Sequence, residues 1–296
     1  MDTLSRFILT LLIVLCSIQS NAQETGISGL NSREFKQYWK VESESPDYQV
    51  TFLNDTVEIL APLGLTLWRK QKMNGDITIE YDACIMDEGK PGDRLSDLNC
   101  FWMASDPLYP ADIWKRSKWR KGIFKHCYSL QMYYLGYGGN YNSTTRFRRY
   151  DGNYEVVEKE NKLPDILKEY TNKEHLLEPN KWYHIKISTN GNKITYYING
   201  ERLVDFRDPN PHRSGWFGFR HTLARARITN FCYINHTPND KQISLQWTVE
   251  APQRHTPVRF SVPFGPDKIQ PGKAFRTPPS NGTEIPADTW EFAPRP

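Results

Sequence analysis

One stretch of 18 residues, 133–150, carries most of the side chains that could do chemistry. Aromatic rings can stack on sugar rings, amides hydrogen-bond to hydroxyls, and a guanidinium binds a carboxylate through two parallel hydrogen bonds. Three glycines among these residues allow a ligand to approach the backbone closely. The stretch therefore predicts a carbohydrate site, and a site for an acidic sugar in particular. Its candidate binding residues are Tyr133, Tyr134, Tyr137, Asn140, Asn142 and Tyr150.

The same stretch also fits catalysis by β-elimination on a uronate. Arg146 and Arg148 would neutralise the carboxylate, and Tyr141 would remove the neighbouring proton. His126 and His221 are alternative bases. Elsewhere in the chain, the candidate substrate-binding residues are Asn99, Gln131 and Arg220.

Three functions remain open at this point: a β-eliminating polysaccharide lyase, a non-catalytic carbohydrate-binding module and a glycoside hydrolase of a jelly-roll type. The hydrolase is disfavoured, because no strand offers the closely paired carboxylates of a retaining glycosidase. Binding detected by calorimetry with no product formed would favour the binding module, whereas a rise in absorbance at 235 nm would favour the lyase.

Neither cofactor nor nucleic acid is expected as a partner. The chain lacks the glycine-rich, P-loop, HExxH and GxSxG motifs, and no metal ligands are predicted in the site. Asp87, Glu88 and Asp93 in a loop leave a structural Ca²⁺ as the one alternative. The net charge is +4, from 38 basic and 34 acidic residues, which is too balanced for a nucleic-acid binder.

The elements that must position these residues are short strands. Residues 76–85 alternate with period two, and residues 98–104 are apolar on both faces, as a central strand would be. In residues 144–150, Arg146, Arg148 and Tyr150 share one face while Phe147 points the other way. Tight turns at Asn54-Asp55, 190–191 and 199–200 separate further strands, and residues 165–170 predict one short helix. About a dozen strands predict an all-β sandwich or jelly roll.

The two ends of the chain differ from this body. Residues 1–22 predict a signal peptide, because an apolar run of about 12 residues is too short to span a bilayer and small residues follow it. We therefore expect export to the periplasm or beyond, with no membrane span. Residues 23–237 form the predicted jelly-roll domain. Residues 238–296 hold 11 of the 20 prolines and predict a Pro-rich extension.

Export also bears on the cysteines. Four of them, Cys84, Cys100, Cys127 and Cys232, follow the predicted signal peptide and lie in apolar runs. This setting favours buried free thiols on strands, and one disulfide is the alternative.

Several segments carry a family resemblance. Residues 64–68, 96–106, 133–150 and 215–220 resemble domain-of-unknown-function family 6250, over about residues 35–235. The resemblance implies a concanavalin A-like jelly roll from an exported protein of polysaccharide-degrading bacteria. It brings no settled activity.

The Pro-rich extension carries a second resemblance. Residues 257–269, 272–276 and 282–290 are similar to the opening of YetA-like exo-rhamnogalacturonan lyases. Residues 238–296 are therefore expected to be the truncated start of a second β module, without its catalytic region. This implies a uronate-containing, rhamnogalacturonan-like glycan as the substrate. Residues 133–142 also resemble jelly-roll alginate lyases, which would give Gln131, Tyr141, Arg146 and Arg148 roles in elimination.

Overall fold

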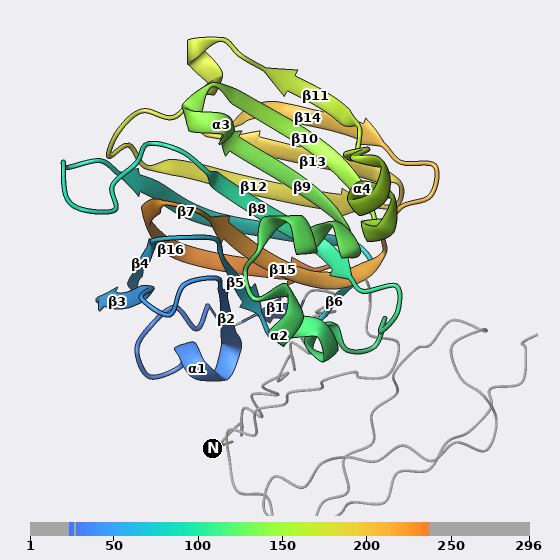
Figure 1. Cartoon of the computed structure of the whole chain (residues 1–296), viewed down its shortest axis with the longest axis horizontal. Helices are drawn as coiled ribbons and strands as arrows, with labels where there is room; N and C mark the ends of the chain where they lie inside the picture. Colours follow the sequence, from blue (N-terminus) through green and yellow to red (C-terminus); the bar gives the residue numbers. More distant parts are fainter. Residues whose placement is uncertain (1–23, 27, 237–296) are drawn as a thin grey trace, which may run out of the picture. The chain divides into compact units, whose positions relative to one another are not determined.

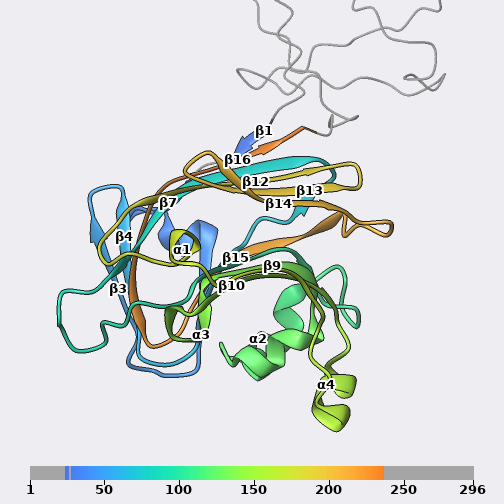
Figure 2. The ribbon, with the colours of Figure 1, turned by 90° about the horizontal axis from the view of Figure 1, so that it is seen from above.

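The computed structural model describes residues 24–26 and 28–236, which form a sandwich of two antiparallel sheets (Figures 1 and 2). The first sheet has the order β14-β13-β12-β7-β16-β4-β3, with β1 paired to β16. Its strands are β1 (Glu24–Gly26), β3 (Gln49–Leu53), β4 (Thr56–Ala61), β7 (Ile77–Met86), β12 (Tyr183–Asn190), β13 (Lys193–Ile198), β14 (Glu201–Arg207) and β16 (Ala224–Asn235).

The second sheet has the order β11-β10-β9-β8-β15-β5-β2, with β6 paired to β15. Its strands are β2 (Trp39–Ser43), β5 (Leu65–Arg69), β6 (Met73–Asn74), β8 (Leu98–Ser105), β9 (Gln131–Gly138), β10 (Thr144–Asp151), β11 (Ile166–Tyr170) and β15 (Ser214–His221). The all-β sandwich that the sequence predicts is confirmed.

Alternation along the strands builds the core between the sheets. All five apolar residues that share one face of β7 are buried there: Ile77, Ile79, Tyr81, Ala83 and Ile85. Cys100 and Trp102 of the central strand β8 meet them from the second sheet. The period-two reading of residues 76–85 therefore selects the correct face of β7, and the strand predicted to be apolar on both faces, β8, contributes to both cores.

The outer face of the second sheet carries a smaller core of its own. Residues 106–130, which we call the cover segment, contain the short helices η1 (Ile113–Arg116), α2 (Ser117–Arg120) and η2 (Phe124–Ser129). Figure 2 shows α2 on the side of β9, β10 and β15 that faces away from the first sheet. The cover segment packs its apolar side chains against Trp68, Phe101, Tyr134, Tyr150 and Trp216. Part of this sheet is therefore covered on both faces.

A buried ion pair fastens the cover segment to the edge strand β2. Arg120 donates to both carboxylate oxygens of Glu42, at 2.8 and 3.2 Å, and also to the carbonyl of Ile113 at 2.7 Å. Arg116 makes two 2.6 Å bonds to the buried carboxylate of Asp106. Bidentate guanidinium–carboxylate pairs fix orientation as well as distance.

Two local predictions need correction. Residues 166–170 form the edge strand β11 and not a helix, because pairing with β10 satisfies their backbone groups despite a helix-compatible sequence. The helix nearby is α4 (Tyr154–Glu160), and the helices of the cover segment were not anticipated. The remaining short helices are α1 (Phe35–Tyr38), α3 (Gly139–Asn142) and η3 (Lys173–His175).

The cysteines agree with the sequence-based expectation. Cys84, Cys100 and Cys127 are buried free thiols, and Cys232 is a half-buried free thiol. The predicted signal peptide and the Pro-rich extension lie outside the described residues. Within residues 24–26 and 28–236, no helix has the length and apolarity needed to span a membrane.

Candidate functional site

A continuous line of polar positions crosses the outer face of the second sheet, one from each of seven strands. Strand register pairs each of these residues with the next, and directly opposed residues share a face. The interior neighbours of these residues, such as Phe219 and Leu135, lie in the core between the sheets. We call this line the polar row. In order from β2 to β11 it contains Glu42, Thr66, Arg220, Asn99, Gly136, Arg146 and Glu169.

The neighbouring line on the same face is mainly apolar. Strand register places Trp68, Gly218, Phe101, Tyr134 and Arg148 in it. The cover segment lies on this line, since the ring of its residue 124 is 5.7 Å from that of Tyr134 and 6.5 Å from that of Phe101. The cover segment therefore takes up the apolar line, and it also covers the β2 half of the polar row. There the Phe124 ring centre lies 5.5 Å from the guanidinium carbon of Arg220, and Arg120 pairs with Glu42.

The polar row is buried over its first five positions and opens only at its β11 end. Glu42 and Thr66 are buried at the β2 end, where Arg120 covers Glu42. The side chains of Arg146 and Glu169 at the β11 end are 33% and 37% exposed, and they form an ion pair with each other. The row is therefore closed at one end and reaches solvent at the other.

The middle of the polar row has unused hydrogen-bonding capacity. Arg220 is 3% exposed and donates through Nη1 to the carbonyls of Leu65 and His221, yet its Nε has no partner among the described residues. Asn99 is 5% exposed and its Oδ1 is likewise unpartnered, as is Oγ1 of Thr66. Buried polar groups are almost always paired, so these three atoms mark the middle of the row as the candidate position for a polar ligand.

Arg220 is also a buried cation without a carboxylate in contact. No ion pair joins it to any acid in the described part of the chain, although Asp97 and Glu44 act on it electrostatically. Burial lowers its pKa below the ordinary arginine value. A buried charge of this kind is costly unless an opposite charge meets it, and an anionic ligand would supply that charge.

A chain of contacts connects the polar row to an exposed tyrosine. Asn99 donates to Asp97 at 3.1 Å, Asp97 also accepts from the guanidinium of Arg94, and that guanidinium lies 4.9 Å from the ring centre of Tyr141. Tyr141 itself is 75% exposed. A solvent-facing ring is thus linked through two fixed charges to Asn99, whose amide oxygen has no partner among the described residues.

The turn that presents Tyr141 has unusual backbone geometry. Asn140, Tyr141 and Asn142 have φ angles of 53°, 57° and 56°, so α3 is a left-handed turn between β9 and β10. Asn142 anchors it through two hydrogen bonds with the backbone of Leu177, and Asn140 donates to Ser143. Left-handed conformations are unfavourable for a bulky residue such as tyrosine, and such strain concentrates at functional sites.

Tyr134 and Gly136 form a matched pair beside the polar row. A Cβ at Gly136 would lie only 2.3 Å from the Tyr134 hydroxyl oxygen, so the phenol occupies the space over this glycine. Burial raises the pKa of Tyr134 far above the ordinary tyrosine value. At neutral pH this phenol is a hydrogen-bonding group and not a base.

Several residues that the sequence assigned to the site lie elsewhere. Tyr133 and Tyr137 face the core between the sheets because they alternate with Tyr134 and Gly136, and Tyr133 donates to Asp208 at 2.7 Å. Tyr150 is buried on the outer face as part of the core under the cover segment. These three rings are thus unavailable for stacking on a surface sugar.

The remaining polar candidates do not gather at the row either. Gln131 begins β9, five residues before Gly136. Arg148 lies in the apolar line, and its guanidinium donates to the carbonyl of Pro164.

Neither candidate histidine is placed as a base at the row. His221 is fully buried, its Nδ1 lies 3.0 Å from the carbonyl of Asp97, and burial lowers its pKa to about 4. His126 belongs to the cover segment, where it stacks on Trp119 at 4.1 Å and contacts the carbonyl of the same residue. In the described part of the chain, its hydrogen bond and ring contacts involve no residue of the polar row.

The loop acids considered for calcium are engaged by an arginine. Arg225 bonds to Asp93 at 2.8 Å, to Glu88 at 3.0 Å and to Glu58 at 3.3 Å. The pKa of Asp93 is held well below its usual value, chiefly by the hydrogen bond from Arg225. Among residues 24–26 and 28–236 no three acidic, histidine or cysteine side chains are grouped to hold a metal ion.

Sequence reasoning missed Arg94, Thr66 and Glu169 as members of this region. Asp97 gave a weak signal, because it stands two residues before Asn99 in the central strand. Glu169 lies in a charged stretch that looks solvated in the sequence, and only the pairing of β11 with β10 brings it to the row. Arg94 lies beside the row through a local ion pair with Asp97, three residues further along the chain.

Comparison with known families identifies the family to which the chain belongs. The model of a domain of unknown function, DUF6250, matches residues 59–231, which is more than half of the chain. The chain belongs to the DUF6250 family. This match runs from within β4 to within β16 and includes the whole of the 133–150 stretch, and it confirms the first resemblance drawn from the sequence. The similarity of the Pro-rich extension to lyases concerns residues outside the described ones and stays a prediction.

One solved structure supports the architecture of this DUF6250 member, and two further ones are similar at lower TM-scores. A protein of unknown function with a galectin-like fold from Bacillus subtilis is 15% identical, with 71% of this chain and 97% of that chain covered and a TM-score of 0.55. The carbohydrate-binding module CBM66 from Bacillus subtilis is 16% identical, with 65% and 92% covered and a TM-score of 0.43. The exoplasmic domain of VIP36, bound to Ca²⁺ and mannose, is 12% identical, with 72% and 89% covered and a TM-score of 0.47. No curated protein matches the chain.

Proposed function

We propose that this DUF6250 protein binds an acidic glycan at the polar row. The observation that carries the proposal is Arg220, a cation that is 3% exposed, has a free Nε and forms no ion pair in the described part of the chain. A uronate carboxylate matches the fork of a guanidinium through two hydrogen bonds. Asn99 beside it offers a free amide oxygen to a sugar hydroxyl.

The rest of the glycan would follow the polar row toward its exposed end. Neighbouring strands lie about 4.8 Å apart, so the three steps from β15 to β10 separate Arg220 and Arg146 by roughly 14 Å. Arg146 is partly exposed and offers a second guanidinium to the same ligand. Tyr141 offers a ring whose exposed surface could stack on a sugar.

Binding without catalysis is the function that this geometry supports best. β-Elimination needs a base that accepts a proton near neutral pH. Of the predicted bases, Tyr141 reaches the row only through Arg94 and Asp97. His126 stacks on Trp119 in the cover segment, and the His221 ring is fully enclosed. Burial raises the pKa of Tyr134, which keeps that phenol protonated. A lyase remains the second candidate because a tyrosine, an arginine and an asparagine stand together at Tyr134, Arg220 and Asn99.

A role in an exported protein that acts on polysaccharide fits this proposal. Its support is the predicted signal peptide in residues 1–22, followed by a body with no membrane-spanning helix among the described residues. Rhamnogalacturonan-like glycans are the proposed substrate class because they contain uronates.

Calorimetry with uronate oligosaccharides and neutral oligosaccharides of equal length tests the proposal, and absorbance at 235 nm reports any elimination product. Arg220→Met should weaken uronate binding by at least tenfold, because losing one partner of a buried charge pair costs about 2–5 kcal/mol and each 1.4 kcal/mol is tenfold. Arg202→Ala is the matched control, since Arg202 is an exposed arginine of β14 paired with Asp205. Unchanged uronate affinity in a folded Arg220→Met variant would refute the proposal. A rise in absorbance at 235 nm would show that the protein is a lyase and not a non-catalytic binding protein.

A further inference from the structure

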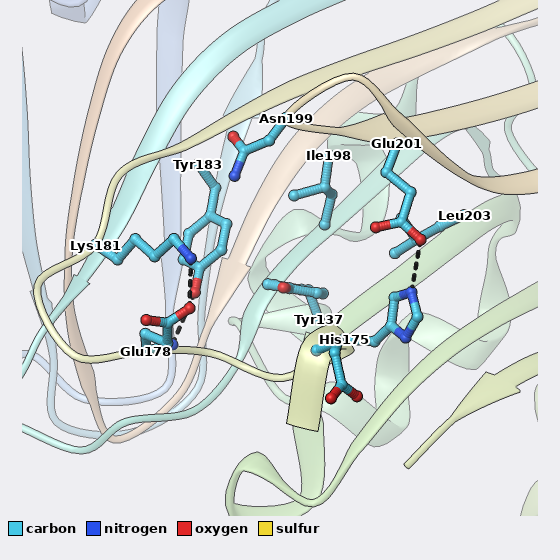
Figure 3. A pocket seen from close by; sticks show the side chains of 10 residues that line it. Tyr137, His175, Glu178, Lys181, Tyr183, Ile198, Asn199, Glu201 and Leu203 are labelled. Atoms are coloured by element: carbon cyan, nitrogen blue, oxygen red, sulfur yellow. Dashed lines mark hydrogen bonds and ion pairs between the residues drawn. The ribbon is translucent and has the colours of Figure 1, made fainter. Parts of the chain in front are cut away.

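A cavity of about 200 Å³ lies at one end of the sandwich, beyond the last residues of β9 and the first of β12 (Figure 3). This space is large enough for several water molecules or one small organic molecule. The residues that define its chemistry are Tyr137, His175, Glu178, Lys181, Tyr183 and Glu201.

Two tyrosine rings, which are 3% and 2% exposed, form part of the inner wall of the cavity. The ring centres of Tyr137 and Tyr183 are 5.2 Å apart in an edge-to-face arrangement. Tyr137 donates to the carbonyl of Leu176 at 3.2 Å, and the hydroxyl of Tyr183 accepts from the backbone N–H of Glu178 at 2.7 Å. Figure 3 shows Tyr137 between the two ion pairs of the cavity, Lys181–Glu178 and His175–Glu201.

Negative charge is in excess around these rings. Glu174, Glu178 and Glu201 line the cavity, whereas its basic residues are Lys181 and His175. Glu178 and Glu201 each use Oε1 in an ion pair, and Oε2 of each has no hydrogen bond to another described residue. Carboxylate oxygens beside aromatic faces are the surroundings that attract an organic cation.

The protein already places one ammonium group in this position. Lys181 pairs with Glu178, and its Nζ lies 5.5 Å from the ring centre of Tyr183. The Lys181 side chain is 44% exposed, so it can turn out to solvent and leave its place to a ligand. The lysine thus shows which chemistry the cavity favours, and it competes for the same carboxylate and ring.

We propose that this cavity binds a protonated primary amine of monosaccharide size, such as an amino sugar with a free ammonium group, and that Lys181 is a tethered competitor. The ammonium would take the place of the lysine between Glu178 and Tyr183, with Glu201 on the opposite side. This site is separate from the polar row, because Tyr137 faces the inside of the sandwich whereas Gly136 faces out. The proposal therefore does not rest on the acidic-glycan site.

Titration calorimetry with glucosamine, N-acetylglucosamine and glucose tests the proposal, at a pH where the amine is protonated. Glucosamine should bind, and the two uncharged sugars should bind at least tenfold more weakly. Lys181→Met should tighten glucosamine binding several-fold by removing the competitor, and Glu201→Gln should weaken it several-fold. Glu155→Gln on α4 is the matched control, because Glu155 is an exposed glutamate paired with a lysine far from the cavity lining.

Three outcomes overturn the proposal: no glucosamine binding, equal binding of glucose, or weaker glucosamine binding in a folded Lys181→Met variant. Arg220→Met separates the two sites. This variant should leave glucosamine affinity unchanged while it lowers uronate affinity, so either site can fail without the other.

Discussion

The ion pair between Arg120 and Glu42 should be a main support of the cover segment. Both side chains are almost fully buried, and replacing Arg120 with Met leaves Glu42 as an uncompensated charge. Breaking a buried pair from one side costs about 3–5 kcal/mol. For a domain of this size each kcal/mol shifts Tm by about 2–4 °C. Arg120→Met should therefore lower Tm by roughly 6–20 °C in thermal unfolding followed by circular dichroism.

The double variant Arg120→Met/Glu42→Met tests the cause of that loss. Replacing both partners of a buried pair by apolar residues is often neutral or stabilising, so most of the lost stability should return. Lys125→Met is the control, because its ion pair with Glu158 lies on the exposed side of the same segment and should leave Tm unchanged. A drop in Tm below about 2 °C for Arg120→Met, or a double variant no better than the single one, would refute the reasoning.

Three further predictions concern the site and the core. Gly136→Ala should push the Tyr134 phenol out of place, cost about 1–3 kcal/mol in urea unfolding and weaken uronate binding; an unchanged affinity would detach Tyr134 from the site. His221 has a folded pKa of about 4, below its ordinary value of 6.5, so the unfolded state takes up its proton first and stability should fall as pH drops from 6.5 toward 4. A folded His221→Met variant should lose less stability over that range, and an identical pH profile would contradict this. Ellman's reagent should modify the half-buried Cys232 in the native protein and the three buried thiols only after unfolding; equal rates for all four would show a looser core.

Much of the fold could be predicted from periodicity. The alternation in β7 and β10 assigns each side chain to a face without knowledge of the neighbouring strand, because successive side chains of a strand point to opposite sides. The hairpin between β12 and β13 followed from Asn190-Gly191, since Gly191 adopts the positive φ that the turn requires.

The helices of the cover segment were beyond such reasoning. They are four to six residues long and are held by tertiary contacts such as Arg120 to Glu42, which are 78 residues apart. Short helices have little stability of their own and depend on packing. The helix predicted at 165–170 failed for the converse reason, because β10 offered those residues a pairing edge.

For the candidate site, the sequence determined which types of side chain are available, and the tertiary structure determined which of them lie next to one another. Density of tyrosines, amides and arginines marked residues 133–150, yet alternation sends Tyr133 and Tyr137 into the core and leaves Arg146 on the outer face. Arg220 and Asn99 come together only because β15 pairs with β8 across more than 100 residues of chain. A local pattern specifies the face on which a side chain lies. Strand order and register, which are set by burying the apolar faces of distant strands together, decide its neighbours.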